Sequence, residues 1–236
     1  MPKLKIFLCG QKYFGWLVFT KLKELGYKVI GVAAPTGDRG KEDRLYRAAY
    51  HLDVPYLIPG GALTAEIMPD GIDLIIAAHS HDYVGVKTLR KARLGGIGYH
   101  PSLLPLHRGR DAIKWTIRMG DRVTGGTVYW LTKGVDCGPI AAQDWCFEPP
   151  GWDATALWRD RLQPMGLRLI LKTLSDLESG RIVSVPQERS CATWEPSLDQ
   201  PPIFRPDLPQ IGEIPGFDIV SAPGEERWDW RRIAGG

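Results

Sequence analysis

The stretch LIIAA, residues 74–78, places five apolar side chains in a row between two polar residues. A strand exposed on one face would alternate apolar and polar residues, whereas a continuous apolar run is typical of a strand buried on both faces of a parallel sheet. Further strand-like stretches lie upstream at 4–8, 29–34 and 55–58, with helix-like stretches between them at 13–25 and 41–52. This alternation predicts an α/β fold with a doubly wound, Rossmann-like and mostly parallel sheet.

The remaining elements are less regular. The pattern predicts a loop at 35–40, short and long helices at 63–68, 111–119 and 154–178, and strands at 127–131 and 140–147. Pro164 and Gly166 are expected to kink or split the long helix. From Pro186 onward the chain holds eight of its 19 prolines, which favours extended, irregular backbone. We therefore expect one main domain over 1–198 and a Pro-rich C-terminal extension over 199–236.

Composition excludes several classes of protein. Of the 236 residues, 44% are hydrophobic and 24% charged, and the formal net charge is only +3, which argues against nucleic acid as the main partner. No apolar run approaches the ~18 residues of a membrane span. The four cysteines lack Cys-x-x-Cys spacing, which favours a reduced protein. We expect a cytoplasmic protein without a membrane partner, with a homodimer as one option for its assembly.

The first strand-to-helix turn, GQKYFG at residues 10–15, occupies the place of a dinucleotide fingerprint. It does not match Gly-x-Gly-x-x-Gly, because Lys12 stands at the second glycine position, and a nicotinamide cofactor is therefore disfavoured. A plain turn is the simpler interpretation. The alternative is an anionic substrate at the helix N-terminus, assisted by Lys12.

The stretch 96–143 carries the residues best suited to chemistry. His100 is followed by Pro101 and Pro105, which stiffen its loop. A titratable ring held in this way suits proton transfer. Asp136 lies in a glycine-rich turn that can approach another loop closely, and its carboxylate can stabilise the charged ring. A purely structural His100 is the competing interpretation, and these residues alone leave both open.

Several motifs in this stretch resemble the formyltransferases that use 10-formyltetrahydrofolate. The motifs are HPSLLP at 100–105, Arg-Gly at 108–109, TGGT at 124–127 and DCGPI at 136–140, in the family's order. Weaker matches, including Gln187 and ATWEP at 192–196, extend the resemblance over roughly 1–198. The resemblance implies a formyltransferase fold and catalytic domain, 10-formyltetrahydrofolate as formyl donor, and a primary amine as acceptor. The acceptor expected here is a small molecule, such as an amino-sugar nucleotide, because 199–236 is too short for the additional domain of methionyl-tRNA formyltransferases.

The resemblance also implies roles for individual residues. His100 and Asp136 are the expected catalytic residues. The residues expected to line the folate site are His79, His81, Asp82, Tyr83, Leu103, Leu104 and Val135. The residues expected to contact the substrate are Lys12, Gly98, Ser102 and Arg108. His79 and His81 also have a spacing that zinc tolerates, but a third ligand is unclear and no metal site is predicted.

One departure from the family stands at Gly98, where the family has an asparagine whose amide is understood to polarise the formyl oxygen. Losing such a donor typically costs ~3 kcal/mol of transition-state stabilisation. His79, His81 and Tyr99 are the candidates to replace it. Without a replacement, the alternatives are a 10-formyltetrahydrofolate hydrolase, or a folate-binding protein with little or no turnover.

Overall fold

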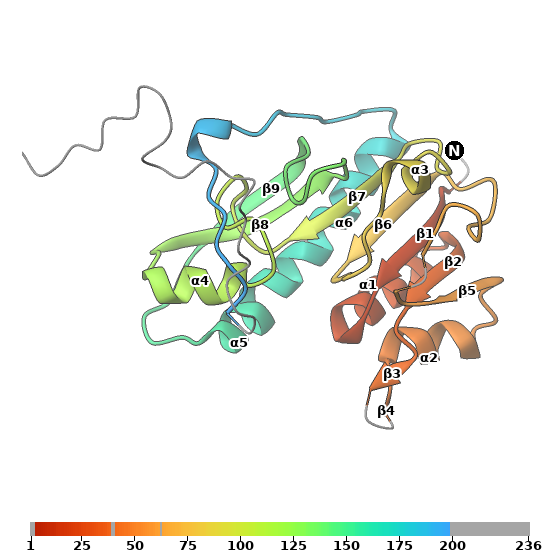
Figure 1. The fold of residues 1–236 in the computed structure, drawn as a ribbon, viewed down its shortest axis with the longest axis horizontal. Helices are drawn as coiled ribbons and strands as arrows, with labels where there is room; N and C mark the ends of the chain where they lie inside the picture. Colours follow the sequence, from red (N-terminus) through yellow and green to blue (C-terminus); the bar gives the residue numbers. More distant parts are fainter. Residues whose placement is uncertain (1–2, 39–40, 62, 199–236) are drawn as a thin grey trace, which may run out of the picture. The chain divides into compact units, whose positions relative to one another are not determined.

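The computed structural model describes residues 3–38, 41–61 and 63–198, so the expected extension at 199–236 lies outside the described residues. Its centre is a seven-stranded sheet (Figure 1). The spatial order is β5 (Tyr56–Pro59), β2 (Lys28–Ala34), β1 (Lys5–Gly10), β6 (Leu74–Ala78), β7 (Gly96–His100), β8 (Val123–Trp130) and β9 (Ile140–Phe147). The strands from β5 to β7 pair in parallel, whereas β8 and β9 pair antiparallel with their neighbours. The α/β class and the mostly parallel sheet are thus confirmed.

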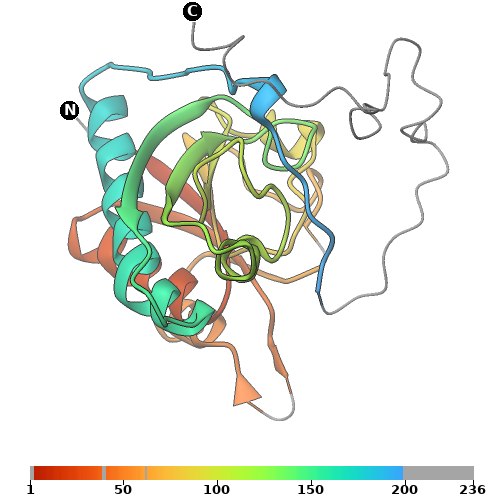
Figure 2. The ribbon, with the colours of Figure 1, turned by 90° about the vertical axis from the view of Figure 1, so that its left-hand side faces the viewer.

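Helices flank this sheet. They are α1 (Lys12–Glu24), α2 (Arg44–His51), α3 (Val86–Leu89), α4 (Ala112–Met119), α5 (Ala154–Leu157) and α6 (Gln163–Glu178), with a π-helical turn at Trp158–Leu162 and a 3-10 turn at Arg189–Cys191. Helices α1 and α2 lie against β2, and α6 runs alongside β8 and β9 (Figure 2). A small hairpin of β3 (Gly37–Asp38) and β4 (Lys41–Glu42) projects from the segment that was expected to be a loop.

The apolar run at 74–78 separates two hydrophobic cores. Leu74, Ile76 and Ala78 belong to the larger core on one face of the sheet, and Ile75 belongs to the smaller core on the other. Since successive side chains of a strand point to opposite faces, a strand with a core on each side needs apolar residues at every position.

Two local expectations were wrong. Residues 63–68 form turns rather than a helix; the segment is too short to hold a helix alone, and Pro69 restricts the residue before it. The strand expected at 127–131 begins earlier, at Val123. Its two glycines resemble a turn but lie within the strand. Glycine allows close packing at this place, since a Cβ at Gly126 would stand 2.3 Å from the hydroxyl of Tyr99.

The long helical stretch is interrupted by the π-helical turn, and Pro164 lies in the first turn of α6, where it removes no needed donor. Gly166, by contrast, lies inside a continuous helix. A Cβ at Gly166 would stand 2.4 Å from the ring of Tyr99, and that ring is fixed by a 2.6 Å hydrogen bond from its hydroxyl to the carbonyl of Leu162. Gly166 therefore permits close approach of α6 to β7 and does not kink the helix.

We predict that Gly166→Ala destabilises the protein although alanine is the better helix former. The helix preference is worth about 1 kcal/mol, whereas overpacking a core costs about 1–3 kcal/mol, so the net loss should be about 1–2 kcal/mol in urea unfolding. Ser175→Ala, at an exposed position of the same helix, serves as the control and should stabilise slightly. A Gly166→Ala variant more stable than the parent would contradict this packing.

Candidate functional site

The candidate site lies at the carboxyl end of β7, whose last residue is His100. The side chain of His100 is buried, with 8% exposed. In the antiparallel pairing of β7 with β8, His100 lies opposite Thr127 and Gly98 lies opposite Tyr129. Residues two apart on a strand share a face, so these four positions form one face of the sheet at its end.

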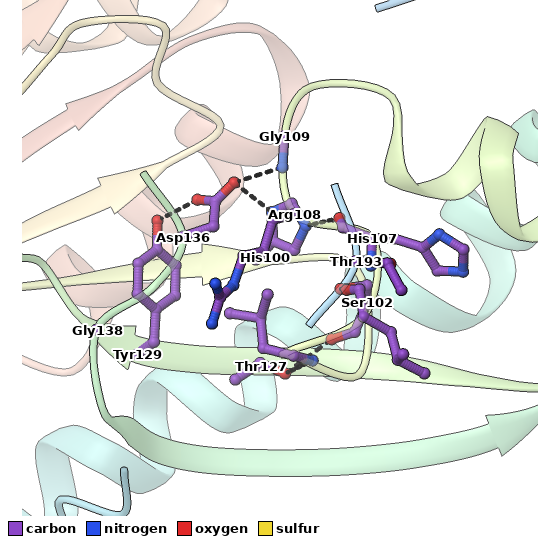
Figure 3. A network of polar contacts seen from close by, with 12 residues as sticks. His100, Ser102, His107, Arg108, Gly109, Thr127, Tyr129, Asp136, Gly138 and Thr193 are labelled. Atoms are coloured by element: carbon purple, nitrogen blue, oxygen red, sulfur yellow. Dashed lines mark hydrogen bonds and ion pairs between the residues drawn. The ribbon is translucent and has the colours of Figure 1, made fainter. Parts of the chain in front are cut away.

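His100 is held between a carboxylate and a carbonyl (Figure 3). Its Nδ1 lies 3.5 Å from Oδ2 of Asp136, and its Nε2 lies 2.7 Å from the carbonyl oxygen of His107. A carbonyl only accepts hydrogen bonds, so Nε2 must donate. Because Nδ1 faces a carboxylate, the doubly protonated ring is the form that suits both neighbours. The structure thus places the imidazole of His100 beside the carboxylate of Asp136.

Asp136 receives donors from two further segments. The hydroxyl of Tyr129 donates to Oδ1 at 2.6 Å, and the backbone N–H of Gly109 donates to Oδ2 at 2.8 Å. The backbone of Asp136 has a φ of +50°, a left-handed conformation that Asp tolerates better than most residues. Both oxygens of the buried carboxyl group thus accept hydrogen bonds from other segments of the chain.

Gln187 supports the turn that carries Asp136. Its Nε2 donates to the carbonyls of Asp136 and Gly138, at 2.9 and 2.7 Å. Its Oε1 accepts two bonds from the guanidinium of Arg108, at 2.6 and 3.2 Å. Arg108, expected to contact the substrate, is therefore directed to Gln187 in this structure.

Thr127 fixes the loop that follows His100. Its hydroxyl donates to the carbonyl of Ser102 at 2.7 Å and accepts from the N–H of Leu104 at 3.1 Å and from Nε2 of Gln143 at 2.8 Å. The hydroxyl of Ser102, expected to contact the substrate, donates instead to the carbonyl of Leu106 at 2.6 Å.

His107 is a buried residue that the sequence reasoning missed. Its backbone has a φ of +53°, and its N–H donates to Oγ1 of Thr193 at 2.8 Å. The ring lies between two carboxylates: Nε2 is 2.7 Å from Asp121, and Nδ1 is 3.1 Å from Glu195 in an ion pair without hydrogen-bond alignment. These contacts fix the position of the His107 carbonyl, which accepts the hydrogen bond from Nε2 of His100.

The residues expected to line the folate site follow β6 and precede β9. Tyr83 and Val135 are exposed, Leu103 is half-buried and Leu104 is buried. The hydroxyl of Tyr83 donates to the carbonyl of Lys133 at 3.0 Å, which joins the loop after β6 to the loop before β9.

The two histidines that follow β6 lie next to each other, and His79 also lies next to Trp158. The ring of His79 stands 5.9 Å from that of His81 and 6.1 Å from that of Trp158. The Oδ1 of Asp82 accepts from the N–H of Gly61 at 2.5 Å. Within 3–38, 41–61 and 63–198, no group of three or more His, Cys, Asp and Glu side chains is arranged to hold a metal ion.

The space beside Gly98 is filled, but not by the side chains that were expected. A Cβ at Gly98 would stand 3.0 Å from Cδ2 of Leu131 and 3.2 Å from Cε1 and Cζ of Tyr129. Tyr99 points to the opposite face, where it reaches Leu162, and the ring of His79 stands beside Trp158. None of His79, His81 and Tyr99 is among the nearest neighbours of that position, and a role for one of them as the replacement donor stays a prediction.

An open groove of about 1050 Å³ lies beside this edge of the sheet, between the start of α1, the β3–β4 hairpin and the start of α6. Its lining includes Lys12 and Trp158, together with Gln11 and Gln163. The latter two are 7% and 6% exposed, and the Nε2 atom of each has no hydrogen-bond partner. Buried amide donors without partners are unfavourable, and both of these side chains belong to residues that line the groove.

The comparisons with known proteins agree on one family. The family model described as Formyl transferase matches residues 61–163. The chain is 32% identical over 202 residues to the mitochondrial 10-formyltetrahydrofolate dehydrogenase of Homo sapiens, covering 82% of this chain and 22% of that protein. It is 30% identical over 203 residues to the methionyl-tRNA formyltransferase of Lactiplantibacillus plantarum, covering 82% and 64%. The chain thus spans about a fifth of the length of the dehydrogenases.

Solved structures share the fold. An N-formyltransferase from Helicobacter canadensis, solved with folinic acid and dTDP-3-aminofucose, superimposes with a TM-score of 0.67 at 16% identity, over 81% of this chain and 70% of that one. Glycinamide ribonucleotide transformylase 1 from Symbiobacterium toebii gives 0.64 at 22% identity, over 78% and 94%.

We predict that His79 makes the fold sensitive to acid. Burial lowers the pKa of His79 to about 4, and the Lys12 cation and His81 act in the same direction. The unfolded chain, with the ordinary value of about 6.5, takes up this proton between pH 6.5 and 4 while the folded chain does not. The free energy of unfolding should therefore fall as the pH is lowered from 6.5 to 4, by up to about 3 kcal/mol.

His79→Gln should flatten the pH dependence of the unfolding free energy between pH 6.5 and 4, as measured by urea titration at several pH values. His51→Gln, at an exposed histidine of α2, is the control. Equal pH dependence in the parent and His79→Gln would rule out an uncharged, buried His79.

Proposed function

Since this chain belongs to the formyl transferase family, we propose that it transfers a formyl group from 10-formyltetrahydrofolate to the primary amine of a small acceptor. The observation that carries the proposal is the buried pair of His100 and Asp136, 3.5 Å apart at the carboxyl end of β7. Ligands of open α/β sheets bind at this edge. The relatives named 10-formyltetrahydrofolate dehydrogenase, and the solved neighbours that hold folates, support the choice of formyl donor.

His100 and Asp136 handle the protons of the reaction. When an amine attacks the formyl carbon, negative charge develops on the formyl oxygen and positive charge on the amine nitrogen. For this step the ring of His100 exchanges the bond from Nε2 to the His107 carbonyl for one to the substrate. The Nε2–H group then stabilises the oxygen, gives its proton to the leaving nitrogen of the folate, and recovers one from the attacking amine. Asp136 keeps the ring oriented and stabilises its charge.

The pterin end of the folate is assigned to the loops 79–84 and 132–136. The bond between Tyr83 and Lys133 joins these loops, and their main chain offers donors and acceptors that match the edge of a pterin. Val135 and Leu103 add apolar surface on either side.

The acceptor is assigned to the groove at the start of α1. Gln11 and Gln163 offer amide donors there, Lys12 adds a positive charge, and Trp158 adds an aromatic face. An acceptor with hydroxyl or phosphate oxygens and an apolar ring suits this lining, and an amino-sugar nucleotide has these groups. A structural neighbour was solved with dTDP-3-aminofucose.

Hydrolysis of 10-formyltetrahydrofolate is the second candidate, with water in place of the amine. The observation that favours it is Gly98, which offers no side-chain amide to the formyl oxygen, together with relatives named 10-formyltetrahydrofolate dehydrogenase. A folate-binding protein without turnover is the third.

The location, assembly and macromolecular partners of the whole protein stay proposals. No helix among the described residues is long and apolar enough to cross a membrane. A cytoplasmic location, a homodimer and the lack of a nucleic acid partner are proposed from the sequence alone.

A single-turnover assay with 10-formyltetrahydrofolate and a panel of amines tests the proposal. A formylated amine supports transfer, free formate supports hydrolysis, and binding without product supports the third option. His100→Ala and Asp136→Ala should each lower the rate by about 100- to 10,000-fold while circular dichroism is unchanged, because both remove proton handling. His51→Ala is the control. Full turnover by a folded His100→Ala variant would refute the catalytic assignment.

Gln11→Leu and Gln163→Leu test the acceptor groove. Each removes one donor from a bound acceptor and should raise the KM of the acceptor by about 5- to 10-fold, without changing the Kd of 10-formyltetrahydrofolate. His51→Leu, in a separate small cavity beside α2, is the control. An unchanged acceptor KM in both variants would place the acceptor elsewhere.

A further inference from the structure

Gly98 and Tyr129 form one structural unit in the sheet. They are directly opposite each other in the pairing of β7 and β8, and a Cβ at Gly98 would already stand 3.2 Å from Cε1 and Cζ of the tyrosine ring. The ring therefore occupies the volume into which a side chain at position 98 would project. Its hydroxyl continues from there to Oδ1 of Asp136, at 2.6 Å (Figure 3).

We propose that Tyr129 is a positioning residue for the pair of His100 and Asp136, and that the glycine at 98 leaves room for its ring. This inference rests on the proposed function of the same site. The phenol acts on the reaction through the carboxylate rather than by touching the formyl group.

The hydroxyl of Tyr129 is a permanent donor. Burial, together with the neighbouring carboxylate of Asp136, raises the pKa of Tyr129 well above its ordinary value. The phenol thus keeps its proton across the working pH range and donates to Oδ1 throughout. Without it, Oδ1 would have no hydrogen-bond donor among the residues that the structure describes, since Gly109 and His100 both face Oδ2.

The ionisable neighbours of this unit are few. His100 approaches Asp136 from β7, Cys137 adjoins it in the chain and raises the pKa of Tyr129 slightly, and Arg108 is directed to Gln187. Tyr129 therefore acts on Asp136 and His100 through the hydrogen bond that it donates to Oδ1. A loss of this donor should make the carboxylate easier to protonate.

The test compares Tyr129→Phe with Tyr99→Phe in the full chain, in whichever reaction of 10-formyltetrahydrofolate the wild type performs. Both variants remove one buried hydroxyl, but that of Tyr99 bonds to Leu162 and not to Asp136. Tyr129→Phe should lower kcat by about 10-fold with little change in KM. It should also move the acid limb of the pH–kcat profile upward by about one unit. Tyr99→Phe should change neither.

Gly98→Ala supplies a second variant. Its methyl group contacts the ring at position 129. In the parent this ring is fixed by its hydrogen bond to Asp136, whereas in Tyr129→Phe the ring is free to shift. Gly98→Ala should therefore lower kcat in the parent more than it does in the Tyr129→Phe background. Equal effects in the two backgrounds would contradict the coupling.

Nuclear magnetic resonance of the His100 ring separates this inference from the proposed function. If the wild type turns over no formyl group, the proposed function has failed, yet the ring titration of His100 should still move in Tyr129→Phe and stay in place in Tyr99→Phe. An unmoved titration, or an unmoved acid limb with parental kcat, would overturn the role of Tyr129.

Discussion

The buried carboxyl group of Asp136 is the group on which the polar part of the structure depends. An ionised carboxylate is costly to bury unless donors surround it. Here those donors come from β7, β8 and the loop before α4, through His100, Tyr129 and Gly109. Each of these segments must be in place for the charge to be tolerated, so the carboxylate ties the end of the sheet to its loops.

The antiparallel half of the sheet makes this arrangement possible. The parallel strands β5, β2, β1, β6 and β7 provide the core and the edge at which β7 ends. Strand β8 then returns along β7 and brings Thr127 and Tyr129 to the face that carries His100. Close approach of the strands and of α6 requires glycine at positions such as Gly126 and Gly166, where any side chain would overlap Tyr99.

Much of the fold could be predicted from the sequence, because hydrophobic periodicity reports directly on which faces are buried. His100 and Asp136 could be paired because the stiffened loop and the glycine turn are local signals, and the structure brings them within 3.5 Å. The contact of Tyr129 with Asp136 could not be predicted, because the face of the sheet on which Tyr129 lies depends on the register of β8. Gly125 and Gly126 within that strand also resemble a turn. Gln187, Thr193 and Glu195 lie in a segment without periodicity. Gln11 and Gln163 meet only through tertiary packing at the groove.

The contacts of residues 187–195 with the site determine when the site can form during synthesis of the chain. Gln187 reaches back 51 residues to Asp136, and Thr193 reaches back 86 residues to His107. During synthesis the strands that carry His100 and Tyr129 leave the ribosome well before these partners, and pairings between distant segments form late in folding. A nascent chain that ends before Gln187 therefore has its sheet but leaves the carbonyls of the Asp136 turn without their donor. The candidate site is completed only when residues 187–195 dock, so a partly made chain does not expose a finished site.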